Sequence, residues 1–364
     1  MNLELEVCPG VPPEWPELTA AGPHTVMPRW LELGADRLGG GYHSFILRAG
    51  DRPELAVGGT ILNGPLPSPR VDPYRILSGR SAGLGLIPDG PHPWADAAPA
   101  DVFPAVLFMY PNFDMFPVGR GAHDPALLRE LVAKLLDWAR ATGIAAFAFL
   151  FATPDAAELM AVLAEQGAQA VPLAGTCVLD VTWDDFDGYL ATLPRKRRVG
   201  ARAELNRLAA AGVVLAEEKL DDVEADLLRL RGKLVAKYDG RPAPDRDRML
   251  LDKIRDLFEG DEIMVVTARC ERRMLGFALL LRDAAHWTAL LVGTDYGDPR
   301  SRLTYFGVTF YRPAALAPGR GITSIGYGLG SWHAKRLRGC RVVPLLAAAL
   351  PVRAGPGHRP SGGG

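Results

Sequence analysis

The chain has 364 residues, enough for about two domains, and its 41 basic and 42 acidic residues nearly cancel, which excludes nucleic-acid binding through bulk charge. Its hydrophobic content of 48% is that of an ordinary globular protein, and no apolar run approaches the ~20 residues of a membrane-spanning helix. Four scattered cysteines without a C-x-x-C pair predict neither a metal site nor disulfides, and an N-terminus with Glu4 and Glu6 is no signal peptide, so we expect a cytoplasmic protein.

The first half alternates strands and helices. We predict a helix at 27–38, a hairpin of strands 44–48 and 55–62, a loop at 64–101 with one short strand at 74–77, a strand at 104–110, helices at 126–142 and 154–165, and strands at 144–151 and 177–181. The helix at 126–142 has the clearest signals, because Asp124 and Pro125 precede it and Gly143 follows it. This order predicts an α/β fold with a central mixed sheet flanked by helices.

The second half predicts a similar series. It contains a helix start at 182–184, a helix after Pro194, a strand at 213–215, helices at 222–238 and 245–258, strands at 262–268, 275–282 and 286–293, a helix at 301–317 interrupted by Pro313, and a strand at 322–325. In both halves a hairpin and a loop precede a helix that ends at glycine and leads into a strand. This similar order of elements in the two halves favours two related domains, residues 1–181 and 182–352, with a flexible tail at 353–364.

A basic helix follows Pro194. Six cations fall within thirteen residues, against the single acid Glu204, inside a chain of net charge −1. Such a cluster suits binding of phosphates, although a solvated helix face has the same pattern.

The stretch at 322–341 combines glycines with cations. A short apolar run is followed by alternate glycines up to Gly330, and then by a mixture of cations and the flat rings of Trp332 and His333. Glycine allows close approach of a backbone to a ligand, and cations with flat rings suit a phosphate or a nucleotide. A solvated basic face after a strand is the other interpretation.

Several familiar catalytic motifs are absent. The sequence has no G-x-x-x-x-G-K-[ST], no H-E-x-x-H and no G-x-S-x-G, and its paired glycines lack the third glycine of a dinucleotide-binding loop. The loop at 118–122 is similar to the glycine loop that holds the coenzyme A pyrophosphate in acetyltransferases. Phe116 stands where Gln or Arg is expected, and Asp124 lies at the helix start, so we expect an ordinary turn there.

Five segments, in this order and spacing, carry a resemblance: TCVLDVTWDDFDGYLATLPRKRRVGARAE, KYDGRP, GFALLLRDAAHWTALLVGTD, TYFGVTFYRPAALAPGRG and GLGSWHAKRLRGC. Together they resemble the FemAB-like (peptidoglycan biosynthesis/recognition) branch of the GNAT acyltransferase superfamily. The resemblance implies two tandem GNAT-like domains, each with a central mixed sheet flanked by helices. It also implies transfer of an amino acid from aminoacyl-tRNA to an amine, without metal, ATP or cofactor.

The resemblance and the local chemistry together give the candidate residues. The catalytic candidates are Lys335, Tyr311 and Asp295; those for tRNA or phosphate are Arg195, Lys196, Arg197, Arg198, Arg202, Arg336 and Arg338; those for substrate are Tyr238, Gly328, Gly330, Ser331, Trp332 and His333. By resemblance, Lys335 lies near the acyl ester, and Cys340 departs from the family's usual Phe.

Aminolysis of an ester or thioester passes through a tetrahedral oxyanion, which a positioned cation such as Lys335 would stabilise. The base for the amine is open between Asp295, a water molecule and a tRNA hydroxyl, and the turn at 294–298 favours a structural role for Asp295 over either of the others. Trp332 or Tyr238 would stack the terminal adenine. We predict an aminoacyl-tRNA-dependent transferase that forms an amide bond on a cell-wall precursor or a specialised metabolite. The alternatives are a GNAT-type N-acyltransferase that uses acyl-CoA and a non-catalytic recognition protein, and the oligomeric state stays open.

Overall fold

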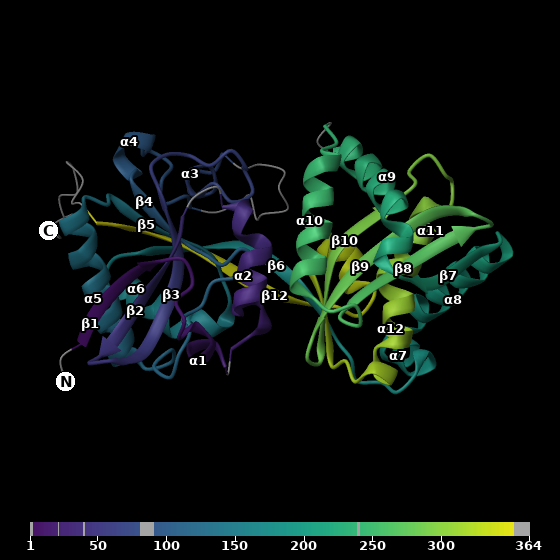
Figure 1. The fold of residues 1–364 in the computed structure, drawn as a ribbon, viewed down its shortest axis with the longest axis horizontal. Coiled ribbons are helices and arrows are strands. Elements are labelled where there is room, and N and C mark those ends of the chain that lie inside the picture. The colour runs from purple at the N-terminus through teal and green to yellow at the C-terminus, as the bar shows by residue number, and fades with distance from the viewer. Residues whose placement is uncertain (1–2, 21, 39–40, 81–90, 239–240, 353–364) are drawn as a thin grey trace, which may run out of the picture. The chain divides into compact units, whose positions relative to one another are not determined.

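The computed structural model describes residues 3–20, 22–38, 41–80, 91–238 and 241–352, and the chain forms two compact units (Figure 1). The second unit is Thr176–Val342; the first unit takes the residues before it and the chain after it. We predicted the join near residue 182 and placed the end of the chain in the second domain. In the structure, most of strand β12 (Arg341–Pro351) instead belongs to the first unit. The predicted tail at 353–364 lies outside the described residues.

The first unit is a mixed sheet with strand order β1-β2-β3-β4-β5-β12, in which β4 and β5 are parallel. Its further strands are β1 (Leu3–Pro9), β2 (Tyr42–Ala49), β3 (Arg52–Leu62), β4 (Ala105–Phe108) and β5 (Ala146–Ala152). Its helices are α1 (Trp15–Thr19), η1 (His24–Val26), α2 (Pro28–Gly34), η2 (Ala35–Arg37), α3 (Pro73–Leu77), α4 (Pro99–Val102), α5 (Pro125–Thr142), η3 (Pro154–Ala156) and α6 (Ala157–Glu165).

Local chemistry explains where these elements begin and end. The Asp124 carboxylate accepts the N–H of Ala126 at 2.8 Å at the start of α5, and Gly143 ends the helix at φ +77°. These predictions are confirmed. The predicted strand at 74–77 is wrong, because Asp72 accepts the N–H of Tyr74 at 3.2 Å and so caps the short helix α3.

The second unit has strand order β6-β11-β10-β9-β8-β7. Its strands are β6 (Gln169–Asp180), which begins in the first unit, β7 (Val213–Glu218), β8 (Ile263–Cys270), β9 (Arg273–Asp283), β10 (His286–Thr294) and β11 (Ser324–Leu329). Its helices are α7 (Phe186–Thr192), α8 (Arg195–Ala210), α9 (Leu220–Tyr238), α10 (Pro244–Leu257), α11 (Ser301–Phe306), the π-helix η4 (Gly307–Tyr311), α12 (Arg312–Leu316), η5 (Pro318–Arg320) and α13 (Trp332–Arg336).

Helices cover both faces of this second sheet. A Cβ atom on Gly276 would meet the methyl of Thr304 in α11 at 2.6 Å, whereas one on Gly293 would meet Leu230 in α9 at 3.1 Å. The predicted helix at 301–317 is confirmed as the series α11, η4 and α12, and its π-helical turn precedes Pro313, which then lies in the first turn of α12.

The parallel strands β10 and β11 pair over only part of the length of β11. Their register holds for three residue pairs, from His286↔Ser324 to Thr288↔Gly326, and the pairing ends there. The remaining part of β11 pairs with β6 alone, with an irregularity at Gly326/Gly328. The end of β11 is therefore free of β10, and it leads into the glycine-rich turn.

No helix in the described part of the chain combines the length and the apolar character needed to cross a membrane.

Gly58 in β3 provides a test of the first unit's packing. A Cβ atom there would collide with the Tyr42 hydroxyl and would lie 2.7 Å from the Tyr110 ring. Both rings are held in the core, so neither can move aside at low cost. We expect Gly58→Ala to lower the free energy of unfolding by about 1–3 kcal/mol in urea denaturation, because overpacking forces shifts in the core.

The matched control is Gly64→Ala, because a Cβ atom on Gly64 meets nothing within 4 Å. We expect a change within about 0.5 kcal/mol for this variant. Equal stabilities of the two variants would contradict the packing described for Gly58.

Asp114 provides a pH-dependent test. Its Oδ1 atom is buried, with no hydrogen-bond partner among the described residues, and burial raises the pKa of Asp114 to about 6. Because the folded state holds this proton more tightly than the unfolded state, the stabilisation is complete below about pH 4 and is lost as the pH rises through 6. We expect Asp114→Asn to raise the free energy of unfolding at pH 7.5 by about 1–3 kcal/mol and to flatten the pH profile between 4 and 7.

Urea denaturation across that pH range measures both effects. Asp96→Asn, at an exposed carboxyl of the same unit, is the control and should leave the profile unchanged. A profile for Asp114→Asn that follows the wild type would show that this carboxyl does not titrate in the folded protein.

Candidate functional site

The turn after β11 has an unusual backbone. Gly328, Gly330 and Ser331 have φ values of +62°, +71° and +51°, in the left-handed region. No neighbouring atom lies within 4 Å of a Cβ position on either glycine, so the backbone conformation, and not crowding, favours glycine there. Helix α13, which the sequence did not predict, starts directly after Ser331.

Lys335 in α13 fixes this turn. Its side chain is buried, and its Nζ donates to the carbonyl oxygens of Tyr327 at 2.7 Å, Gly328 at 2.9 Å and Leu329 at 2.8 Å. An ammonium has three N–H groups, so all of them are used. Burial lowers the pKa of Lys335, and the three carbonyl dipoles compensate for the loss of water.

Arg338 lies at the centre of a second buried cluster. Only 7% of it is exposed, and its guanidinium carbon lies 3.1 Å from the ring centroid of Phe306. Its Nη2 lies 3.4 Å from the Glu204 carboxylate, which also accepts the hydroxyl of Tyr311. We predicted Arg338 as a phosphate ligand; here its guanidinium is buried against Phe306 and paired with Glu204, an arrangement that holds α8 and the chain after α13 together.

Tyr311 and Glu204 connect three elements. Tyr311 comes from η4, Glu204 from α8, and Arg338 follows α13. Burial, together with the hydrogen bond to Glu204, raises the pKa of Tyr311, so its hydroxyl stays protonated at neutral pH. Tyr189 in α7 adds a fourth element, because its hydroxyl donates to the Arg338 carbonyl at 3.0 Å. The sequence analysis missed Glu204 and Tyr189; the lone acid in a basic helix was a signal for Glu204.

The cations at the start of α8 face solvent. Arg195, Lys196 and Arg197 are exposed and Arg198 is half-buried, and among the described residues none of the four has an ion-pair partner. Arg202 differs, because its guanidinium pairs with Asp187 at 2.7 Å. The first turn of the helix therefore presents four cations without acidic partners in the described chain, and Arg207 in its last turn bonds only to the Ala203 carbonyl.

Asp295 lies in a separate cluster. Its carboxylate is 1% exposed and forms ion pairs with Lys233 and Arg273. Burial opposes the ionised form, but the hydrogen bonds from these two cations hold the pKa of Asp295 below its usual range. Both carboxylate oxygens are occupied, and this geometry favours the structural alternative over a role as a base.

The structure places the remaining predicted residues as follows. Ser331, His333 and Arg336 are exposed at the glycine turn and α13, and Trp332 is half-buried against the second unit's core. Tyr238 is the last residue of α9, and its side chain lies outside the described residues. Among the described residues, no group of three His, Cys, Asp or Glu side chains is arranged to hold a metal ion.

The fold is similar to several solved structures at low sequence identity. FemX has a TM-score of 0.60 and 12% identity over 94% of this chain and 96% of its own. A tandem GNAT protein from the clavulanic acid biosynthesis pathway has a TM-score of 0.50 and 14% identity over 96% and 99%. L-PGS from Bacillus licheniformis has a TM-score of 0.51 and 13% identity over 91% and 94%.

This is a tandem GNAT-like fold. No protein-family model and no curated protein sequence matches the chain. The predicted fold class is therefore confirmed by structure alone.

Each GNAT-like unit has a loop between the first strand of its parallel pair and the following helix. In the first unit, Gly121 N–H in this loop donates to the Glu54 carbonyl at 2.9 Å, and Asp124 caps the helix. In the second unit, the Asp298 carboxylate accepts the N–H of Arg300 at 2.9 Å, and Asp295 accepts that of Gly297 at 3.3 Å. In both loops, carboxylates lie where a phosphate would need N–H groups.

Lys335→Met tests the role of the buried ammonium. The variant removes three charge-assisted hydrogen bonds and leaves the carbonyls of Tyr327, Gly328 and Leu329 without this donor. We expect the free energy of unfolding to fall by about 2–4 kcal/mol in urea denaturation. Arg336→Met, at the exposed neighbour in the same helix, should change it by less than about 0.5 kcal/mol. Equal effects would mean that Lys335 does not hold the turn.

Proposed function

We propose that this chain is an aminoacyltransferase that moves an amino acid from aminoacyl-tRNA to an amine, on a cell-wall precursor or a specialised metabolite. The observation that carries the proposal is the first turn of α8, where Arg195, Lys196, Arg197 and Arg198 lack acidic partners in the described chain. A row of unpaired cations suits the phosphate backbone of an RNA. The tandem GNAT-like fold shared with FemX, and the resemblance to FemAB-like proteins, support the same donor.

The proposed reaction is an aminolysis. The acceptor nitrogen attacks the ester carbonyl carbon, the tetrahedral oxyanion collapses, the bond to the ribose oxygen breaks, and the amine proton leaves with that oxygen as a hydroxyl. The turn that Lys335 fixes is the proposed place for the oxyanion, which main-chain N–H groups would stabilise. Lys335 then acts by positioning the turn, since its own N–H groups contact carbonyls.

The alternative donor, acyl-CoA, has less support. Its pyrophosphate would need N–H groups at a loop and helix start, and both crossover loops present carboxylates there: Asp124 in the first unit and Asp295 and Asp298 in the second. These carboxylates already accept N–H groups that a pyrophosphate would need, and in the first unit the charge of Asp124 would also repel it.

The experiment compares donors directly. The purified protein is incubated with amine acceptors and either radiolabelled aminoacyl-tRNA pools or acyl-CoAs, and amide products are counted. We expect product from aminoacyl-tRNA, lost after RNase treatment. Product that survives RNase and requires a CoA thioester would contradict the proposal, and absence of product with both donors would favour a recognition protein.

Charge reversal tests the RNA surface. We expect Arg197→Glu with Arg198→Glu to weaken tRNA binding at least about tenfold and to reduce its dependence on salt, because fewer counterions are released on binding. Filter binding at several salt concentrations measures both. Arg140→Glu on the exposed face of α5 is the control, since that side chain lies in the first unit and pairs with Asp137. Binding that does not change would make the first turn of α8 a solvated surface.

A further inference from the structure

One carboxylate on the inner side of α8 contacts the chain that follows α13. The Glu204 carboxylate lies 3.4 Å from Nη2 of Arg338 and also accepts the hydroxyl of Tyr311. Among the described residues, no other carboxylate pairs with Arg338, whose side chain is 8% exposed. Because a buried guanidinium is stable only beside a charged or polar partner, Glu204 determines where Arg338 lies relative to α8.

Arg338 is connected to the glycine turn through α13. Its Nη1 donates to the Ala334 carbonyl at 3.0 Å, and its main-chain N–H donates to the Lys335 carbonyl at 2.9 Å. The Lys335 ammonium in turn donates to the three carbonyls at 327–329. Directional polar contacts therefore connect Glu204 to the proposed oxyanion turn at every step.

The helix that carries Glu204 also carries the proposed RNA contacts at its first turn. Arg198 precedes Glu204 by six residues, which is about 9 Å along a helix axis. The main-chain bonds of the helix make this part of α8 one body, so the position of Glu204 also sets the position of the first turn. The apolar contacts of α8, at Ala201 and Leu208, are not directional and fix the helix less closely.

We propose that Glu204 is a positioning residue for the transfer reaction: its contact with Arg338 sets the distance between RNA bound at the first turn of α8 and the glycine turn. The inference rests on the proposed function, because it requires an acyl ester that is carried by RNA. A shift of about 1 Å between a bound substrate and the groups that stabilise its transition state can lower a rate about 100-fold. Loss of the contact therefore slows transfer and leaves RNA binding unchanged.

Glu204→Gln tests this role, because it removes the charge and keeps the shape of the side chain. With the full chain and saturating aminoacyl-tRNA, we expect the single-turnover rate of amide formation to fall at least about tenfold. The Kd for tRNA in filter binding should stay within about twofold of the wild type. A merely structural role would lower the amount of active protein, and so the amplitude of the reaction, but not its rate.

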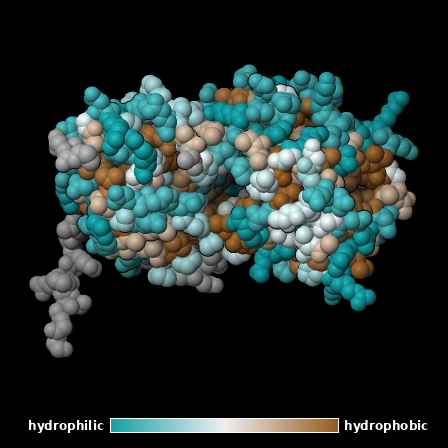
Figure 2. Space-filling view, turned by 90° about the horizontal axis from the view of Figure 1, so that it is seen from below, coloured by the Kyte–Doolittle hydropathy of each residue, from teal (hydrophilic) through white to brown (hydrophobic). Residues whose placement is uncertain are grey.

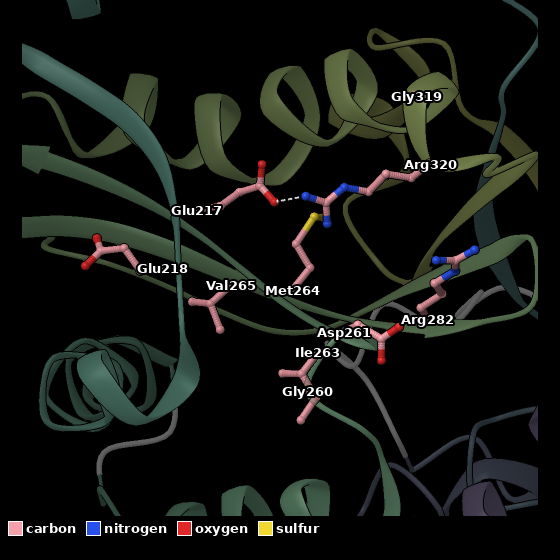
Figure 3. Close-up of a pocket in the computed structure, with 10 residues that line it drawn as sticks. All are labelled: Glu217, Glu218, Gly260, Asp261, Ile263, Met264, Val265, Arg282, Gly319 and Arg320. Carbon is pink, nitrogen blue, oxygen red and sulfur yellow. Dashed lines mark hydrogen bonds and ion pairs between the residues drawn. The ribbon is translucent and has the colours of Figure 1, made fainter.

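Glu218 in β7 is the matched control. Its carboxylate accepts a threonine hydroxyl and pairs with Arg269 at 2.7 Å, and its side chain is 24% exposed, compared with 19% for Glu204. Glu218 lines a pocket of about 530 Å³, in which Glu217 points to the other side of β7 and pairs with Arg320 (Figure 3). Glu218→Gln removes a comparable contact, between β7 and β8, and should transfer at the wild-type rate.

Hydrogen exchange provides a readout that does not depend on activity. We expect Glu204→Gln to speed the exchange of the N–H groups at 330–338 about tenfold, because this segment loses its contact with α8, and Glu218→Gln to leave it unchanged. A double variant, Glu204→Gln with Arg338→Gln, should transfer no more slowly than the slower single variant, because both residues act through one contact.

A Glu204→Gln protein that transfers at the wild-type rate would overturn the proposal. So would a rate that falls only in proportion to tRNA affinity, or exchange at 330–338 that stays at the wild-type level. Wild-type protein that forms no amide from aminoacyl-tRNA would refute the proposed function and this role with it. An active wild type beside an equally active Glu204→Gln would refute this role alone.

Discussion

The second GNAT-like unit depends on one buried ammonium. A lysine removed from water costs several kcal/mol unless its N–H groups find partners, and the carbonyls of Tyr327, Gly328 and Leu329 supply them. Those carbonyls come from the part of β11 that pairs with β6 and no longer with β10. The ammonium therefore stabilises a strand end that has lost one neighbour, and it sets the position at which α13 begins. The left-handed residues of the turn are kept in place by the same contacts.

Charge is distributed unevenly although the chain is nearly neutral. Most acids of the second unit lie in ion pairs, such as Asp295 with Lys233 and Asp298 with Arg300. Glu204, the acid of the basic helix, is used by Arg338 and Tyr311 on the inner side of α8. Among the described residues, no carboxylate forms an ion pair with a cation of the first turn of that helix. Figure 2 shows that hydrophilic residues cover most of the visible face, with hydrophobic residues in patches among them.

Elements were predicted correctly from the sequence where several local signals indicated the same structure. The caps of α5, the glycine at its end and the periodic apolar residues all indicated one helix, and the structure has it. The strand expected at 74–77 failed because β-like side chains there are overridden by the Asp72 cap. Strand β1 and helix α13 were not predicted, because β1 is stabilised by pairing with β2, which is distant in sequence, and the five-residue helix α13 depends on the side chain of Lys335. The burial of Arg338 could not be predicted from the sequence either, because it depends on contacts with Phe306 and Glu204, which are distant in the sequence.

The two units have a similar order of elements, but the loop from strand to helix is held differently in each, between β4 and α5 in the first unit and between β10 and α11 in the second. In the first, the loop bonds to the neighbouring β3 and Asp124 caps a long helix. In the second, two aspartates bind the loop's own N–H groups while three cations neutralise them from outside: Lys233, Arg273 and Arg300. Both solutions use main-chain donors that a pyrophosphate would otherwise need. A GNAT-like scaffold built this way retains its parallel strand pair and its glycine turn, while the main-chain donors of both crossover loops are already in use. The cations in the first turn of α8 have no acidic partner in the described chain.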